Sequence, residues 1–329
     1  MAEYLFPKGA LKYALSWDFG TKVQKSLAKI MEFHSHHNGN VAINFSGGLD
    51  STVLLHLARN TFPNMRAVFL DTGIENKEVV EHVRSLDNID VITPRYCELN
   101  QKKTKCTNCA FGCFGVVIKM HGVCYPDKNT AKHYGSYIKG GYSSNKQYLD
   151  GKLTDLLAET KNRDLPMDIS DRCCYYLKKR PLDKWHKDNG MFPIIGTRAN
   201  ESLNRTIAWM KAGCNNFGKR SRSTPLAFWS KNDVLLYLKR FDVPYPSIYG
   251  EITEDKKGKL RNTGVERTGC AVCLVQCGKE IDGITKFERL KQSEPELWNY
   301  GVNTCGLGAF MDCFGIRYGK EIISEHRHN

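Results

Sequence analysis

The stretch VAINFSGGLDST, residues 41–52, decides the fold of this chain. Its first five residues form a short apolar run, which predicts a buried β-strand. Ser46, Gly47 and Gly48 follow, where the backbone must turn tightly. A strand, a glycine turn and the start of a helix together favour a bound anion, because the free N–H groups and the helix dipole both attract negative charge. The stretch therefore predicts a phosphate-binding loop.

The helix after the turn is expected to be capped by Asp50 and to continue through Ser51 and Thr52. The loop is neither GxxxxGK[ST] nor GxGxxG. Instead, SGGxDS resembles the PP-loop of ATP pyrophosphatases, which bind ATP and cleave it between the α- and β-phosphates. The simpler alternative is an ordinary glycine turn between a strand and a helix.

Further strands and helices alternate along the chain. Short apolar runs predict strands at 67–70, 89–93, 192–195 and 225–229. Helices are predicted at 76–85 and 201–211. This order indicates an α/β fold, with a parallel twisted sheet and helices on both faces. Ligands bind at the carboxyl ends of such strands. Ser46, Asp71 and Gly196 all follow predicted strand ends.

Composition narrows the class of protein. The chain has 329 residues, of which 41% are hydrophobic, and we find no run approaching the roughly 20 apolar residues of a membrane span. The N-terminus lacks the layout of a signal peptide, so we expect a cytoplasmic protein without membrane contact. The net charge of +13 suits an adenine nucleotide or a nucleic acid, although a generally basic surface is an equal alternative. Thirteen cysteines favour metal or redox chemistry over disulfides.

We expect three regions along the chain. Residues 1–39 are predicted to be a helical arm, and residues 40–249 a nucleotide-binding domain. A Cys-rich insertion at 102–150 interrupts that domain. Residues 250–329 are a Cys- and Gly-rich region expected to pack on the core, and its order is expected to depend on bound metal.

Several stretches resemble one family. They are SGGLDST, FLDTG at 69–73, CCYYLKKRPL at 173–182, IIGTRANESLNR at 194–205, PLAFWSKNDVLLYL at 225–238 and ERTGCAVC at 266–273. In this order they resemble the iron–sulfur branch of the phosphoadenosine phosphosulfate (PAPS) reductase-like PP-loop proteins. The resemblance implies an adenine nucleotide α-hydrolase-like fold.

The resemblance also implies roles for individual residues. It implies adenine beside Phe69, phosphates on the loop, and Mg²⁺ placed by Asp50 or Asp71. It implies that Arg198 or Arg205 meets the anionic end of the ligand, whereas the simpler alternative for both is a solvated helix surface.

Four cysteines are candidates for one metal centre. Cys270 and Cys273 have the CxxC spacing that lets two thiolates reach one metal, and Cys173 and Cys174 are adjacent. The resemblance implies that these four hold a 4Fe–4S cluster. Thiolates alone also suit zinc, and buried free thiols are the alternative. The reserve ligands are Cys214 and Cys277.

A second thiol set lies in the insertion. Cys106, Cys109, Cys113 and Cys124 include a CxxCxxxC spacing. Zn²⁺, a second cluster or a set of thiols that supplies sulfur all fit this pattern.

Three functions remain open. The leading one is an enzyme that cleaves ATP to activate a substrate, in sulfur transfer onto a nucleic acid or nucleotide. The second is a sulfonucleotide reductase that releases sulfite with a thioredoxin-like reductant, using Cys305 in Cys-Gly-Leu as its nucleophile, where Gly308 replaces the family's His. The third is a nucleic-acid-binding protein with a structural cluster. The acceptor and the sulfur donor are not evident from the sequence.

Overall fold

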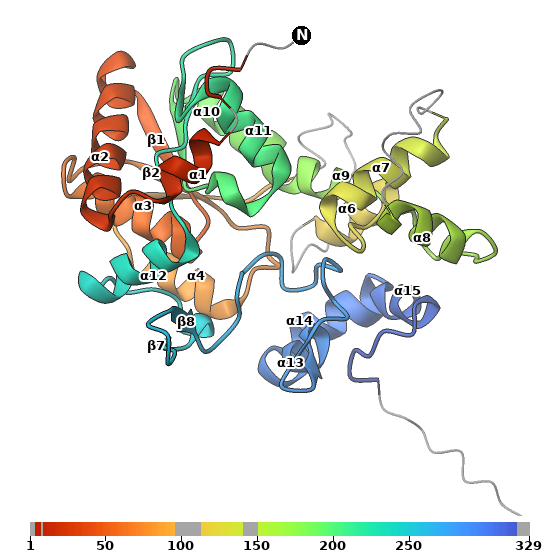
Figure 1. Cartoon of the computed structure of the whole chain (residues 1–329). Helices are drawn as coiled ribbons and strands as arrows, with labels where there is room; N and C mark the ends of the chain where they lie inside the picture. The colour runs from red at the N-terminus through yellow and green to blue at the C-terminus, as the bar shows by residue number, and fades with distance from the viewer. Residues whose placement is uncertain (1–3, 8, 96–112, 141–150, 321–329) are drawn as a thin grey trace, which may run out of the picture. The chain divides into compact units, whose positions relative to one another are not determined.

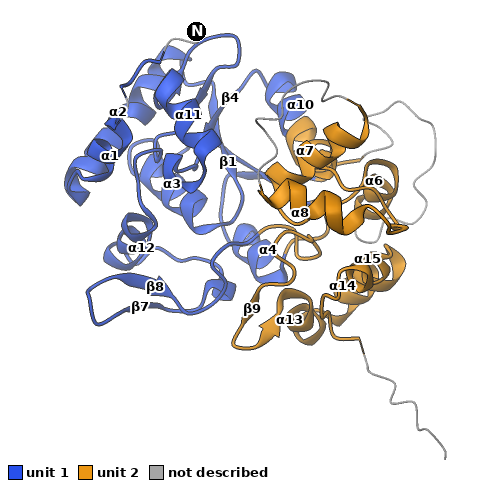
Figure 2. Cartoon of the chain, turned by 45° about the vertical axis from the view of Figure 1, so that its right-hand side comes forward, with its two compact units in different colours: residues 1–71, 76–92, 182–268 blue, residues 72–75, 93–181, 269–329 orange. Residues whose placement is uncertain are grey.

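The computed structural model describes residues 4–7, 9–95, 113–140 and 151–320. These residues form two compact units (Figure 2). Unit 1 takes in residues 1–71, 76–92 and 182–268, and unit 2 takes in residues 72–75, 93–181 and 269–329. Cys106 and Cys109 lie outside the described residues.

Unit 1 is built on a six-stranded sheet in the order β3–β2–β1–β4–β6–β5, of which Figure 1 labels β1 and β2. The strands are β1 (Val41–Phe45), β2 (Ala67–Leu70), β3 (Ile89–Ile92), β4 (Phe192–Ile195), β5 (Asn215–Asn216) and β6 (Arg222–Ser223). All neighbours are parallel except β5 and β6. The predicted α/β fold with a mostly parallel sheet is therefore confirmed.

Helices flank this sheet. They are α1 (Ala10–Leu15), α2 (Phe19–His36), α3 (Leu49–Arg59), α4 (Lys77–Arg84), α10 (Arg180–Asp188), α11 (Leu203–Ala212) and α12 (Lys231–Arg240), with short turns η3 (Ala199–Glu201) and η4 (Ser247–Tyr249). A hairpin of β7 (Ile252–Glu254) and β8 (Leu260–Asn262) follows. The helices predicted at 76–85 and 201–211 are confirmed within two residues at each end.

The predicted strand at 225–229 is wrong. This segment is a series of turns in which the Ala227 N–H donates to Thr224 O at 3.1 Å. Its apolar side chains enter the core of unit 1, and Trp229 is fully buried with its indole N–H donating to Ser26 Oγ at 2.8 Å. A short apolar run signals burial without specifying a strand.

Unit 2 is mainly helical. It contains α6 (Phe114–His121), α7 (Lys128–Ile138), α8 (Gly151–Thr160), α9 (Arg172–Cys174), α13 (Lys286–Ser293), α14 (Pro295–Asn299) and α15 (Leu307–Cys313), the π-helical turns η2 (Tyr175–Lys179) and η5 (Tyr300–Thr304), and the strand pair β9 (Glu280–Ile281) and β10 (Ile284–Thr285). Its core joins Val117 and Leu177 to Val272, Phe287 and Phe310. Residues far apart in the sequence thus share one core.

No helix in the described part of the chain has the length and apolar character needed to cross a bilayer.

Candidate functional site

The loop between β1 and α3 is shaped by glycine. Gly47 has φ +67°, and a Cβ there would lie 2.5 Å from Val79 Cγ1. Any side chain at this position would therefore strain the backbone and collide with α4. At the end of β4, a Cβ on Gly196 would lie 3.0 Å from Asp50 O, so this glycine allows the strand end to approach the start of α3.

Hydrogen bonds between serines hold the loop. Ser51 Oγ donates to Gly48 O at 2.9 Å and lies 3.0 Å from Ser46 Oγ. The N-cap of α3 is Gly48, which offers no side-chain cap. The prediction that Asp50 caps this helix is wrong, because Asp50 lies within the first turn. Thr52 Oγ1 is buried without a hydrogen-bond partner among the described residues, which leaves it suited to a ligand oxygen.

Asp50 instead forms an ion pair. Arg198 Nε donates to Asp50 Oδ1 at 2.7 Å, and Arg198 Nη2 donates to Glu201 Oε1 at 2.8 Å. The Arg198 side chain is 12% exposed, so solvent screens these contacts weakly. The first turn of α3 and the loop after β4 are thereby joined.

Glu201 forms ion pairs with three guanidinium groups. Besides Arg198, Arg205 Nη1 pairs with Glu201 Oε2, and Arg267 Nη2 lies 3.4 Å from Glu201 Oε1. Burial lowers the pKa of Arg205, and the neighbouring charge of Arg267 lowers it further. Three guanidinium groups therefore lie around two carboxylates, Glu201 and Asp50, and guanidinium groups are typical partners of phosphate and carboxylate anions.

Sequence reasoning missed Glu201 and Arg267, although both lie in the quoted motifs. The available signal was helical spacing, because residues three and four apart on one turn are neighbours and Glu201 lies three after Arg198 and four before Arg205. Lys231 was also missed. Burial lowers its pKa, while Glu266 and Asp50 act in the opposite direction, so Lys231 also shares in this charged group.

A hydroxyl pair lies against the loop. A Cβ on Gly48 would come within 3.2 Å of Tyr249 Oη and 3.6 Å of Thr268 Oγ1. These two hydroxyls are themselves 2.7 Å apart. They place polar atoms beside the backbone that we expect to hold phosphate.

The other expected nucleotide residues have distinct positions. Asp71 follows β2, and its N–H donates to Ile92 O at 2.9 Å. Since β1 and β2 are parallel, Asp71 and Ser46 lie at the same edge of the sheet. Phe69 is 2% exposed and its side chain belongs to the core.

A group of thiols occupies unit 2. Cys173 donates a hydrogen bond to Cys174, which lowers the pKa of Cys174 to about 6 and raises that of Cys173. The charges of Cys273 and Cys174 act on Cys270, whose pKa burial raises to about 11. The four cysteines predicted to share one centre therefore lie close enough to interact.

Cys124 lies close enough to Cys174 and Cys273 for their charges to act on its thiol. Burial is the main cause that raises its pKa, and the charges of Cys273 and Cys174 add to it. Cys113 is buried in the same core, and its expected partners Cys106 and Cys109 lie outside the described residues.

Two lysines lie beside these thiols. Lys178 Nζ is 3.5 Å from Glu75 Oε1, and although burial opposes its charge, Cys270 and Glu75 hold its pKa above the ordinary value. Lys286 Nζ donates to Cys270 O at 2.9 Å and Cys273 O at 3.0 Å, and burial lowers its pKa. Partly buried ammonium groups beside thiols favour the anionic thiolate, which is the form that binds metal.

The residues fit a thiolate-bound metal by their chemistry. Among the described residues, however, no three or more His, Cys, Asp or Glu side chains are arranged closely enough to hold one ion. Binding would require these thiols to draw closer together.

The remaining cysteines have other surroundings. Cys214 lies in the core of unit 1, where Trp209 Nε1 donates to its Sγ at 3.4 Å. Cys277 is fully buried in unit 2, and burial raises its pKa to about 12. Cys305 is 2% exposed, and burial raises its pKa, although a hydrogen bond with Tyr300 opposes this.

Comparison with known proteins adds a family and a set of similar structures. The profile of the phosphoadenosine phosphosulfate reductase domain matches residues 40–105 and 139–276. Two uncharacterized proteins of Methanocaldococcus jannaschii, MJ0973 and MJ0066, are 25% and 23% identical over 284 and 268 residues. The matches cover 85% and 80% of this chain but 52% and 41% of those proteins, so the chain spans about half their length.

The chain also resembles solved structures, at low sequence identity and low TM-score. The phosphoadenylyl-sulfate reductase from Candida auris is 15% identical with a TM-score of 0.39, over 77% of this chain and 98% of that one. The U34-tRNA thiolase NcsA from Methanococcus maripaludis, solved with its [4Fe-4S] cluster, is 11% identical with a TM-score of 0.34, over 94% and 86%. At these TM-scores the similarity carries no argument about function.

Proposed function

Because this chain belongs to the phosphoadenosine phosphosulfate reductase domain family, we propose that it is a PP-loop enzyme that cleaves ATP to activate an acceptor. One observation carries the proposal. The loop at residues 46–52 leads into α3 without a side-chain cap, and Asp50 and Arg198 meet beside it at 2.7 Å. This arrangement supports binding of a polyphosphate.

Different groups of this chain would stabilise different parts of the reacting ATP. The N–H groups at the start of α3 would hold phosphate oxygens, and the guanidinium groups around Glu201 would stabilise negative charge on the leaving pyrophosphate. Asp50 and Asp71 would supply carboxylate oxygens to Mg²⁺, which neutralises phosphate charge. An acceptor oxygen would attack the α-phosphorus, pyrophosphate would leave, and a sulfur nucleophile would then displace AMP together with that oxygen.

The thiols of unit 2 would bind an iron–sulfur cluster in this enzyme. We assign Cys173, Cys174, Cys270 and Cys273 as its ligands, with Cys124 beside them. Lys178 and Lys286 would offset the negative charge of the thiolates. When bound, such a cluster supplies a site for sulfur or electron transfer.

The buried state of Cys305 disfavours the sulfonucleotide reductase alternative. That reaction needs a thiolate nucleophile that can reach the sulfate sulfur. Cys305 is 2% exposed, and burial raises its pKa, which disfavours the thiolate form.

An assay after anaerobic purification tests the proposal. Iron and acid-labile sulfide are measured on the full chain, and pyrophosphate release is followed with Mg²⁺, ATP and an RNA pool as the acceptor. We expect bound iron and pyrophosphate, and we expect Asp50→Asn to abolish the release. Release of sulfite from adenylylsulfate, without pyrophosphate from ATP, would overturn the proposal in favour of the reductase.

A further inference from the structure

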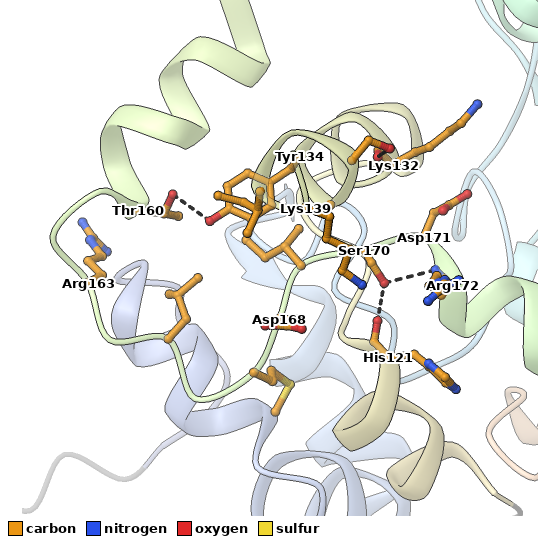
Figure 3. Close-up of a pocket in the computed structure, with 16 residues that line it drawn as sticks. His121, Lys132, Tyr134, Lys139, Thr160, Arg163, Asp168, Ser170, Asp171 and Arg172 are labelled. Atoms are coloured by element: carbon orange, nitrogen blue, oxygen red, sulfur yellow. Dashed lines mark hydrogen bonds between the residues drawn. The ribbon is translucent and has the colours of Figure 1, made fainter. Parts of the chain in front are cut away.

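Unit 2 contains a cavity of about 830 Å³ whose lining includes none of the residues proposed above to bind ATP (Figure 3). Its wall comes from the end of α6, from α7, from the end of α8 and from residues 163–172. All of these residues belong to unit 2. Natural small-ligand sites occupy about 300–1,000 Å³, so the cavity has the size of a binding site.

The wall is held by hydrogen bonds between distant segments. The Val123 N–H donates to Asp168 O at 2.8 Å, and the Ser170 N–H donates to Val123 O at 2.8 Å. The Ser170 hydroxyl donates to His121 O and accepts from the Arg172 N–H at 3.2 Å, as Figure 3 shows. The cavity is therefore largely formed before a ligand arrives.

Positive charge dominates the lining. The charged residues that line it are Lys132, Lys139, Arg163, Arg172, Asp168 and Asp171, together with His121. Arg163 pairs with Glu159 at 3.7 Å. Within the described parts of the chain, Lys132, Lys139 and Arg172 form no ion pair, which leaves their charge available to an anion. Arginine and lysine together are typical of phosphate recognition.

The lining also includes apolar side chains. They are Leu165, Met167 and Ile169, and the aromatic ring of Tyr134 is part of the same lining. The Tyr134 hydroxyl donates to Thr160 Oγ1 at 3.0 Å, so its polar atom is satisfied within the protein. An apolar wall beside cations matches a nucleotide, which combines a flat base with a phosphate. A ligand that carries only acidic groups would gain no favourable contact with these apolar side chains.

The cavity adjoins the thiol group. Asp171 and Arg172, which line it, directly precede Cys173 in the chain. Asp171 also lies close enough to Cys174 to act on its charge. A ligand in the cavity would therefore lie near Cys173 and Cys174.

We propose that this cavity binds a nucleotide unit of the acceptor, with its phosphate on Lys132, Lys139 and Arg172 and its base against the apolar wall. That this nucleotide belongs to the acceptor rests on the proposed function, whereas nucleotide binding by the cavity does not. The phosphate can belong to a free mononucleotide or to a nucleic-acid strand, and both have the same chemistry.

The test measures binding of a short fluorescein-labelled single-stranded RNA to the full chain by anisotropy. We expect the double substitution Lys132→Ala and Lys139→Ala to weaken binding by about tenfold or more at low salt, and to make the salt dependence less steep. The matched control is Lys152→Ala with Lys161→Ala, which removes two exposed lysines outside the cavity. An equal loss in the control would overturn the proposal.

A second variant tests the cavity without changing charge. Ser136 lines it, so Ser136→Trp should fill it and also weaken RNA binding, with thermal unfolding as the check on folding. Unchanged RNA affinity in this variant would overturn the proposal, as would equally effective displacement of the RNA by polyglutamate. Competition by AMP would indicate a mononucleotide site, and its absence a strand site. Failure of the wild-type chain to release pyrophosphate would remove the proposed function and leave these binding results standing.

Discussion

Arg198 Nε lies 2.7 Å from Asp50 Oδ1, which joins the segment after β4 to the first turn of α3. The two residues are 148 positions apart in the chain. Their contact places a guanidinium and a carboxylate beside the loop that we propose to bind phosphate, where charge develops in the proposed reaction.

Substitution of Arg198 should mainly affect turnover. Arg198→Ala leaves Asp50 and Glu201 without their shared partner, and we expect pyrophosphate release to fall by about a hundredfold, or roughly 3 kcal/mol. Arg198→Lys should recover little, because an ammonium cannot bridge both carboxylates with a planar fork. Arg261→Ala, at a 67% exposed side chain, is the control. Full activity of Arg198→Ala would contradict this role.

Gly47→Ala should destabilise the protein and remove ATP binding. The added Cβ meets Val79 Cγ1 at 2.5 Å and φ is +67°, so we expect a loss of about 2–3 kcal/mol in the free energy of unfolding. Gly190→Ala is the matched control, because Gly190 has φ +64° with no heavy atom within 4 Å of an added Cβ. Urea unfolding of both variants separates the collision from the backbone strain. Equal losses in the two would show that the collision costs nothing.

The thiol group should determine iron content. Cys270→Ser and Cys273→Ser are each expected to lose most of the iron and acid-labile sulfide after anaerobic reconstitution, because serine does not replace a thiolate ligand well. Cys124→Ser should lower iron as well, since Cys124 interacts with this group. Cys313→Ser, whose thiol donates to Ala309 O at 3.3 Å, should keep wild-type iron. Retention of iron in both CxxC variants would count against a cluster at these cysteines.

His186 should make folding sensitive to acid. Its ring lies 2.6 Å from Asn44 Oδ1, and burial lowers its pKa to about 4. In the unfolded chain the ring has a pKa near 6.5, so between pH 6.5 and 4 only the unfolded state gains a proton. We expect stability to be complete above pH 6.5 and to fall by up to about 3 kcal/mol as the pH drops to 4.

The check is the free energy of unfolding by urea at several pH values. His186→Gln should flatten the profile over this range, whereas His36→Gln, at an exposed position, should not. A steep profile that survives in His186→Gln would assign the effect to another group.

Local patterns predicted much of unit 1. The run at 41–45, the turn at Gly47 and the helix that follows are all set by neighbouring residues, so β1, the loop and α3 could be read directly. The capping box at the start of α12 is also a local feature, because Ser230 and Asp233 are only three residues apart. The apolar run at 225–229 was misread because burial of such a run does not specify its backbone.

Contacts between residues that are far apart in the chain could not be predicted from local sequence patterns. Glu201 forms ion pairs with both Arg198 and Arg267, and Cys124 lies near Cys174 and Cys273. Both arrangements depend on packing between segments that are far apart in the chain. The sequence by itself determined the strand, the glycine turn and the helix, because hydrophobic pattern and backbone preference act over a few residues. Only the tertiary structure decided which charges and thiols meet, because those contacts form when separate segments share one core.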